Sequence, residues 1–164
     1  MISNGKFYES QFEEATIELL REAHWQYAFG DDIHRKYTDP LIEEDLRNFL
    51  TVQYKDKNLT TSEMDSIVAN LRNTGGQNDY YALRNAFLLY RDGYDFAYSD
   101  GRDNPFRLEY IDFEHPDHNI FRCVNQFVME QGRENRRPDI LLFINGIPVC
   151  IIELNNPTKQ NATI

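Results

Sequence analysis

The N-terminal part of the chain carries apolar residues at helical spacing. In ESQFEEATIELLREA, residues 9–23, the apolar positions recur every three to four residues: Phe12, Ala15, Leu19 and Ala23. Ser10 and Glu13 fit a capping box, in which two side chains satisfy backbone N–H groups at the start of a helix. The pattern therefore predicts a first helix that starts at Ser10.

Three further helices are predicted up to residue 93. They begin after Asp39-Pro40, at Thr61 or Ser62, and near Asn78. Asp39 is expected to cap the second helix and Pro40 to occupy its first turn, because proline lacks the N–H that a first-turn residue leaves unpaired. The third helix is expected to stop at the Gly75-Gly76 pair and the fourth by Gly93.

The pattern after Gly93 is extended. Residues 94–113 suggest two strands joined by a polar loop that contains Asp100-Gly101. Residues 119–130 suggest another strand, with one alternating face made of Phe121, Cys123, Asn125, Phe127 and Met129. Helices followed by an antiparallel-leaning sheet predict an α+β fold or a mixed α/β layer fold.

Two almost continuously apolar strands follow, joined at Asn145-Gly146. They run from Ile140 to Ile144 and from Val149 to Ile152. Strands of this composition are typical of sheets that are covered on both faces, so we expect both to be buried. Cys123 and Cys150 fall within apolar strands and outside any C-x-x-C pair, so a structural role as small hydrophobes is expected for both.

Length and charge limit the possible function. A chain of 164 residues with 41% hydrophobic residues can bury one core, so we expect a single domain over residues 1–164. No apolar run reaches membrane-span length and the start lacks a signal-peptide pattern, so a cytoplasmic protein without membrane contact is expected. A net charge of −10 argues against a free-standing nucleic-acid binder. One local exception is the arginine cluster Arg122, Arg133, Arg136 and Arg137, which a solvated turn would equally explain.

Two isolated carboxylates lie at the ends of the last two apolar strands. Asp139 opens the first strand and Glu153 closes the second. A carboxylate at a buried strand end is costly to desolvate unless it is paired, hydrogen-bonded or bound to a metal. A divalent cation such as Mg²⁺ or Mn²⁺ would relieve the repulsion between two converging acids. The alternative is structural, with Asp139 capping the turn after Pro138 and Glu153 pairing with an arginine.

Sharing one cation requires both carboxylates on one face of the sheet. A plain two-residue loop at Asn145-Gly146 would direct Asp139 and Glu153 to opposite faces, because strand side chains alternate. An odd loop or a bulge reverses this parity. We therefore predict an odd loop or a bulge between the two acids, for which Ile144, Asn145 and Gly146 would form a three-residue turn with Gly146 left-handed.

One part of the sequence resembles the PD-(D/E)xK nuclease motif. It consists of the string RRPD, then an apolar stretch with a central NG, and then IEL. Its context is ordered: FEEATIELLREA, LIEEDLRNFL, LRNAFLLYRDG, IDFEHPDHNIFRCVNQF and GRENRRPDILLFINGIPVCIIELNNPT. This series resembles the N-terminal endonuclease domain of the restriction (R) subunit of type I restriction-modification enzymes, over nearly the whole chain. The resemblance implies a restriction-endonuclease-like mixed central sheet flanked by helices, at the N-terminus of a larger translocase-nuclease subunit.

The resemblance also implies a type I site-specific deoxyribonuclease activity and its residues. It maps the metal ligands onto Asp139 and Glu153, and a third acid onto Glu13 of the first helix, which is also the capping-box residue. The motif lysine falls at Asn155, a neutral amide that imitates an ammonium poorly, and Lys159 is the nearest substitute. DNA contacts are expected from Arg133, Arg136 and Arg137. A nuclease-like module that docks or positions DNA without cutting it is the alternative.

Cofactors and partners follow from the same resemblance. Mg²⁺ or Mn²⁺ would serve the acids, whereas ATP would serve only motor domains of the full-length subunit, since no Walker A motif occurs in this chain. Double-stranded DNA and the methyltransferase (M) and specificity (S) subunits are the implied partners.

His115 and His118, in EHPDH, are not expected to bind metal. Pro116 lies between them, and a two-residue gap is no recognised zinc pattern without further ligands.

Overall fold

The computed structural model describes residues 9–74, 79–132 and 134–154. The chain forms two compact units: one combines the residues up to Leu41 with those from Phe121 onward, and the other runs from Ile42 to Ile120. The prediction of a single domain stays a prediction, because two compact units of one chain can belong to one domain.

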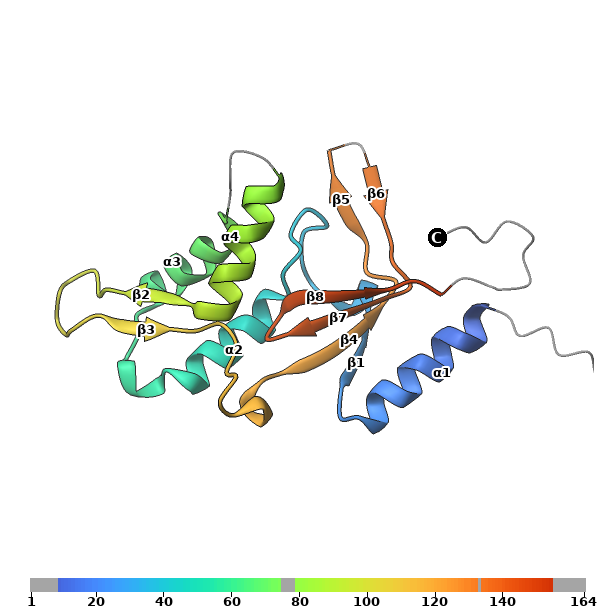
Figure 1. The fold of residues 1–164 in the computed structure, drawn as a ribbon, viewed down its shortest axis with the longest axis horizontal. Coiled ribbons are helices and arrows are strands. Elements are labelled where there is room, and N and C mark those ends of the chain that lie inside the picture. The colour runs from blue at the N-terminus through green and yellow to red at the C-terminus, as the bar shows by residue number, and fades with distance from the viewer. Residues whose placement is uncertain (1–8, 75–78, 133, 155–164) are drawn as a thin grey trace, which may run out of the picture. The chain divides into compact units, whose positions relative to one another are not determined.

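The first unit is built on a mixed sheet with the strand order β1-β4-β7-β8 (Figure 1). These strands are β1 (Gln26–Phe29), β4 (Phe121–Asn125), β7 (Ile140–Ile144) and β8 (Ile147–Ile152). β1 runs parallel to β4, whereas the other two pairings are antiparallel. Helix α1 (Glu9–Glu22) packs beside β1, and a short 3-10 helix, η1 (Gly30–Asp32), follows that strand. A mixed α/β fold with a helical N-terminal half is thereby confirmed.

A two-stranded ribbon extends from this sheet between β4 and β7 (Figure 1). It consists of β5 (Met129–Gln131) and β6 (Glu134–Arg136), paired antiparallel. The core of this unit is apolar and buried: Cys123, Val124, Phe127, Ile140, Leu141, Phe143 and Ile147. The rings of Phe127 and Phe143 lie 5.0 Å apart. Each fully buried side chain of this size stabilises the fold by about 1.5–3 kcal/mol, so this core fixes the strand ends that carry the acids.

The second unit combines helices with a small hairpin. Its elements are α2 (Glu43–Gln53), η2 (Lys55–Lys57), α3 (Thr61–Arg72), α4 (Asp79–Asp92), β2 (Tyr94–Phe96), β3 (Phe106–Leu108) and η3 (Pro116–His118). Leu46, Leu50, Ile67 and Leu108 are completely buried in it. Tyr110 is buried too, and its hydroxyl donates a hydrogen bond to the carbonyl oxygen of Ile67 at 2.8 Å. None of the described helices is both long and apolar enough to cross a membrane.

Two helix starts differ from the predictions. α1 already includes Ser10, so Ser10 is a helical residue rather than the cap. α2 begins only at Glu43; the Asp39 carboxylate instead accepts the backbone N–H of Leu41 at 3.1 Å, which makes Asp39-Pro40 a turn before the helix.

The predictions for α3 and α4 agree with the structure. α3 begins at Thr61, and Thr60 forms a complete capping box with Glu63. It ends at Arg72, and the Gly75-Gly76 pair lies outside the described residues, as does Asn78 before α4. α4 ends at Asp92, followed by Gly93 with a positive φ of 63°. The hairpin of β2 and β3 encloses the Asp100-Gly101 loop as expected.

Strands β1 and β8 differ from what the sequence predicted. β1 was not predicted, because its four residues are mostly exposed and show no alternation. β8 was expected to be covered on both faces, yet Val149 is 43% and Ile151 55% exposed. The reason is position: β8 is an edge strand of the sheet. Cys150 on β8 is accordingly exposed, whereas Cys123 on the inner strand β4 is buried as expected.

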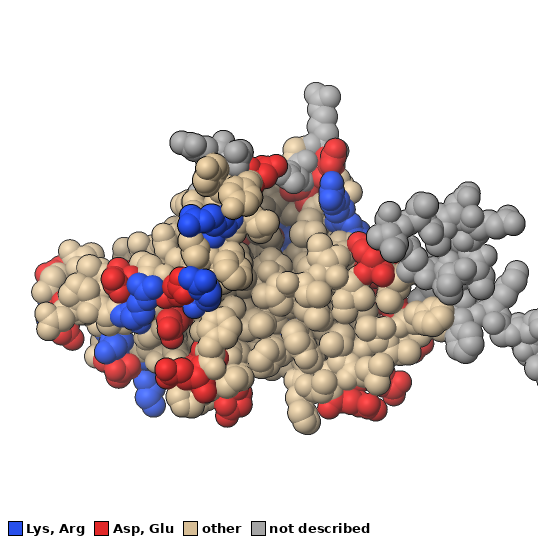
Figure 2. All heavy atoms as spheres, in the orientation of Figure 1, with Lys and Arg blue, Asp and Glu red and all other residues tan. Residues whose placement is uncertain are grey.

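The surface is predominantly acidic. Acidic side chains outnumber basic ones 27 to 17 over the whole chain. On the face seen in Figure 2, acidic side chains gather over α1, whose Glu14, Glu18 and Glu22 are exposed, while basic side chains are scattered.

A buried carboxylate, Glu63, organises the second unit. It is 3% exposed and receives two hydrogen bonds from the Arg102 guanidinium, at 2.6 and 2.8 Å. The backbone N–H groups of Thr60 and Ser99 donate to it at 2.9 and 3.3 Å. Arg102 and then these backbone donors hold the pKa of Glu63 far below its ordinary value.

This lowered pKa predicts a pH-dependent stability. Because the pKa of Glu63 is lower in the folded state, the ionised carboxylate adds to the free energy of unfolding at pH values above the unfolded-state pKa of about 4.3. This contribution is lost as the pH falls through the folded-state pKa. We expect Glu63→Gln to lower the urea midpoint at pH 7, and the gap between variant and wild type to narrow below about pH 4. Glu109→Gln, which alters an exposed carboxylate, should leave the midpoint unchanged. A gap that is constant with pH would contradict this role for Glu63.

Candidate active site at the ends of the central strands

The turn between β7 and β8 is a two-residue loop. Ile144 pairs with Ile147, and the two residues between them, Asn145 and Gly146, have φ values of 51° and 75°. Two positive φ values are the requirement of a type I′ turn, which Asn-Gly satisfies well. The predicted three-residue turn that included Ile144 is therefore wrong.

A two-residue turn alone would direct Asp139 and Glu153 to opposite faces of the sheet, and a bulge in β8 reverses this. Phe143 pairs with Pro148 but Leu142 pairs with Cys150, so Val149 is an extra residue. Proline has no N–H to donate to a strand ladder, and it is tolerated in sheets mainly at edges and bulges. The prediction of an odd loop or a bulge is thus confirmed by its second alternative.

The bulge brings the two acids into register. Beyond it, Ile140 pairs with Ile152. Extending this register by one residue puts Asp139 opposite Glu153, and directly opposite residues project from the same face of a sheet.

Hydrogen bonds fix Asp139 at the start of β7. Its carboxylate Oδ2 accepts the backbone N–H of Leu154 at 2.7 Å, and its carbonyl oxygen accepts the N–H of Gln126 at 3.3 Å. Asp139 is partly buried, whereas Glu153 is exposed. The carboxylate therefore ties the end of β8 to the start of β7, which is a different contact from the suggested cap of the turn after Pro138.

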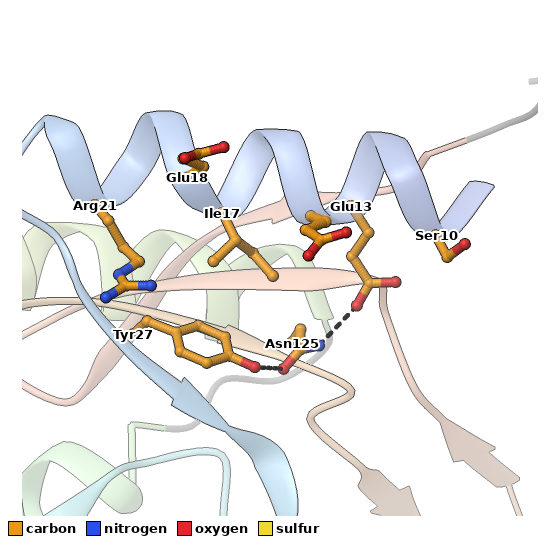
Figure 3. A pocket seen from close by; sticks show the side chains of 8 residues that line it. Ser10, Glu13, Ile17, Glu18, Arg21, Tyr27 and Asn125 are labelled. Atoms are coloured by element: carbon orange, nitrogen blue, oxygen red, sulfur yellow. Dashed lines mark hydrogen bonds between the residues drawn. The ribbon is translucent and has the colours of Figure 1, made fainter. Parts of the chain in front are cut away.

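Glu13 reaches the sheet from α1. Its Oε1 accepts hydrogen bonds from the side-chain amides of Asn125 at 2.8 Å and Gln126 at 3.3 Å. Asn125 in turn accepts the hydroxyl of Tyr27 at 3.0 Å (Figure 3). Glu13 thus contacts the end of β4 rather than closing a capping box.

An open groove of about 530 Å³ runs between α1 and the strands beside it. In Figure 3, Glu13 and Asn125 lie toward one end of this groove and Arg21 toward the other, with Tyr27 between Asn125 and Arg21. Its remaining lining residues are Ser10, Glu14, Ile17 and Glu18.

Gln126 is the residue that the sequence analysis missed. It contacts two of the predicted acids, since its side chain binds Glu13 and its backbone N–H binds the carbonyl of Asp139. Its φ of 56° is left-handed, which ends the regular alternation of β4 after Asn125. The adjacent polar pair Asn125-Gln126 within an apolar stretch was the available signal.

Comparisons with known proteins identify the family to which the chain belongs. The family model described as "Type I restriction enzyme R protein N terminus" matches residues 6–164. The chain belongs to this family. The resemblance stated from the ordered motifs is thereby confirmed.

Two relatives of the chain are named as endonuclease subunits of type I restriction enzymes. The type I restriction enzyme HindI endonuclease subunit of Haemophilus influenzae is 27% identical over 95% of this chain. A Methanocaldococcus jannaschii protein named as the MjaIXP type I restriction enzyme endonuclease subunit is 29% identical over 92% of this chain. The matches cover only 16% and 15% of those two proteins, so the chain spans about a sixth of their length.

The donor chemistry at the strand ends of this R-protein domain suits a hard cation. Asp139 and Glu153 are the residues that would hold it, because carboxylate oxygens are the ligands that Mg²⁺ and Mn²⁺ prefer. Among the described residues, the oxygens of Glu13, Asp139 and Glu153 do not all lie within 4.8 Å of one another. A role for Glu13 as a third ligand therefore stays a prediction, whereas its contact with Gln126 is observed.

The predicted DNA-contacting arginines of the R-protein domain lie on and beside the ribbon. Arg136 closes β6 and Arg137 follows it, and both are exposed. Arg136 approaches Glu134 at 3.7 Å, an ion pair that exposure to water makes weak. Arg133, Asn155 and Lys159 lie outside the described residues.

Arg35 anchors the base of the ribbon. Its guanidinium carbon lies 3.4 Å from the centroid of the Phe127 ring, and its N–H groups donate to the carbonyl oxygens of Asp39, at 2.9 Å, and Val128. The backbone N–H of Glu130 donates to the carbonyl of Tyr37 at 2.9 Å. Burial lowers the pKa of Arg35. These contacts fasten the ribbon to the segment after η1.

Gly30 offers a test of the Gln126 geometry. A Cβ at Gly30 would lie 2.4 Å from the carbonyl oxygen of Gln126, so Gly30→Ala forces the backbone apart. We expect a loss of about 1–3 kcal/mol in the free energy of unfolding, measured by urea denaturation. An unchanged midpoint would show that this close approach does not exist in solution.

Proposed function

We propose that this chain is the metal-dependent DNA endonuclease domain of a type I restriction R subunit, acting on double-stranded DNA in the cytoplasm. The observation that carries the proposal is the bulge at Val149, because the register that follows it, Ile140 with Ile152, leads to Asp139 opposite Glu153 when it is continued by one residue. Two carboxylates on one face of neighbouring strands form a binding site for a hard divalent cation.

Each residue has a defined role in the proposal. A bound Mg²⁺ or Mn²⁺ supplies Lewis acidity and a template for a phosphate oxygen and water. Asp139 and Glu153 hold the cation, and the hydrogen bond from Leu154 orients the Asp139 carboxylate. Glu13, fixed by Asn125 and Gln126, presents a third carboxylate toward the same strand ends.

DNA binding must depend on local contacts and on partners. Arg133, Arg136 and Arg137 would contact phosphates, but a chain with a net charge of −10 cannot supply broad electrostatic attraction. The remaining part of the R subunit, with its ATP-driven motor, and the M and S subunits would bring DNA to the site.

Asn155 supports a second candidate function. It occupies the motif position of a lysine whose ammonium would offset charge on the phosphate in the transition state. Without that charge, or a substitute such as Lys159, the domain would dock or position DNA in the restriction complex without cutting it.

Plasmid cleavage by the full R subunit in its complex, with ATP and Mg²⁺, tests the first function. Asp139→Asn and Glu153→Gln should each lower the cleavage rate by about 10²-fold or more, because each removes a charged metal ligand. ATP hydrolysis should be unchanged, which separates lost cleavage from lost assembly. Wild-type cleavage rates in both variants would overturn the assignment.

Asn155→Lys separates the two functions. If the wild type cuts slowly for lack of the ammonium, the variant should cut on the order of 10²–10³-fold faster. The matched control is Asn156→Lys, which adds the same charge one residue away. An uncut plasmid with wild type and Asn155→Lys alike, in a complex that still translocates, would favour the positioning module.

Metal binding by this chain alone should be weak. Mg²⁺ sheds its water reluctantly, and a few carboxylates without substrate phosphates leave it mostly hydrated. Calorimetry should therefore give a Mg²⁺ dissociation constant above the micromolar range. Sub-micromolar affinity would contradict the proposed site.

A further inference from the structure

A separate group of metal-ligating side chains lies in the second unit. Asp112, His115 and His118 each offer one ligand atom, and these atoms all lie within 4.8 Å of one another. It is the one such group of three among the described residues. Asp112 precedes η3, and the two histidines flank Pro116 and Asp117.

Asp112 is held rigidly before any ligand arrives. It is 5% exposed, and its Oδ1 accepts the backbone N–H groups of Glu114 at 3.1 Å and His115 at 2.8 Å. Its Oδ2 accepts the side-chain amide of Gln53 at 3.1 Å. Burial alone would raise the pKa of Asp112, but the His115 N–H, His118 and Gln53 lower it overall, so the group is a carboxylate at neutral pH.

Both imidazoles face this carboxylate. Their Nδ1 atoms lie 3.6 Å (His115) and 3.0 Å (His118) from Asp112 oxygens. The rings are stacked with centroids 4.9 Å apart and an angle of 19°. Pro116 starts η3, whose tight turn aligns residues three apart. The two histidines therefore lie side by side across Pro116, with Asp112 as a further ligand, so neither ground for expecting no metal at these residues holds in the structure.

We propose that Asp112, His115 and His118 form a binding site for a transition-metal dication of the Zn²⁺ type. Two imidazoles and one carboxylate suit such an ion, whereas Mg²⁺ prefers oxygen ligands alone. The His115 and His118 side chains are 60% and 51% exposed, so small rotations can close the ligand distances, and the outer side stays open to water. This inference is independent of the proposed nuclease function.

The expected affinity is moderate. A bound ion replaces the hydrogen bond between His118 and Asp112, and three ligands bind less tightly than a closed four-ligand site.

Calorimetric titration of the chain with Zn²⁺ tests the site. We expect one Zn²⁺ per chain, and a His115→Ala/His118→Ala double variant should lose affinity at least about 10-fold. The chain contains two other histidines, which give a matched control: His24→Asn/His34→Ala should bind Zn²⁺ as the wild type does. Asparagine is chosen at position 24 because it tolerates the left-handed φ of 68° there.

Two outcomes would overturn the proposal. One is wild-type Zn²⁺ affinity in the His115→Ala/His118→Ala variant, whose fold is checked by circular dichroism; a variant that fails this check is replaced by His115→Asn/His118→Asn. The other is loss of Zn²⁺ binding in an Asp139→Asn/Glu153→Gln variant with both histidines intact, which would assign the ion to the strand-end acids instead.

Discussion

The single extra residue in β8 is the constraint on which the candidate active site depends. Side chains of a strand alternate between faces, and the two-residue turn at Asn145-Gly146 would by itself put Asp139 and Glu153 on opposite faces. The bulge at Val149 reverses this relation. Pro148 lies directly before the extra residue, and proline is tolerated in sheets mainly at edges and bulges. One inserted residue therefore decides whether the two acids project from the same face.

A second backbone irregularity connects these strands to α1. Gln126 leaves β4 in a left-handed conformation, its N–H held by the carbonyl of Asp139 and its side chain by Glu13. Gly30, the first residue of η1, permits the close approach of the Gln126 carbonyl. Segments far apart in sequence thus meet at one residue, and the position of the acids depends on backbone geometry as much as on their own side chains.

The sequence predicted what is repetitive or chemically unusual, and missed what depends on tertiary context. α3 and α4 could be predicted because their apolar residues recur at helical spacing between clear helix ends. Asp139 and Glu153 could be singled out because a carboxylate at the end of an apolar strand is costly to desolvate unless it has a partner. β1 is too short and too exposed to show a period, and it forms only because β4 lies parallel to it. The apolar residues of β8 suggested burial, but composition does not reveal that a strand lies at the edge of a sheet.

The hairpin shows where such reasoning succeeds and where it stops. Two acids can share a face only if the connection between their strands has an odd loop or an inserted residue, so a bulge or an odd loop could be predicted. The choice between them could not, because Asn-Gly suits a type I′ turn and a glycine-containing three-residue turn alike. Gln126 carried no motif beyond the polar pair that it forms with Asn125, and that pair reveals neither its left-handed φ nor its contacts with Glu13 and Asp139.

The two proposed cation sites differ in ligand chemistry, and this affects how metal dependence is interpreted. Mg²⁺ would occupy carboxylate oxygens at the strand ends and avoid the imidazoles beside Asp112. Mn²⁺ accepts both oxygen and nitrogen ligands, so it would enter both sites. Cleavage that responds alike to the two ions must arise from the oxygen site, whereas an effect seen with Mn²⁺ or Zn²⁺ alone must be separated from binding at His115 and His118. The histidine variants, which leave the strand ends untouched, make that separation.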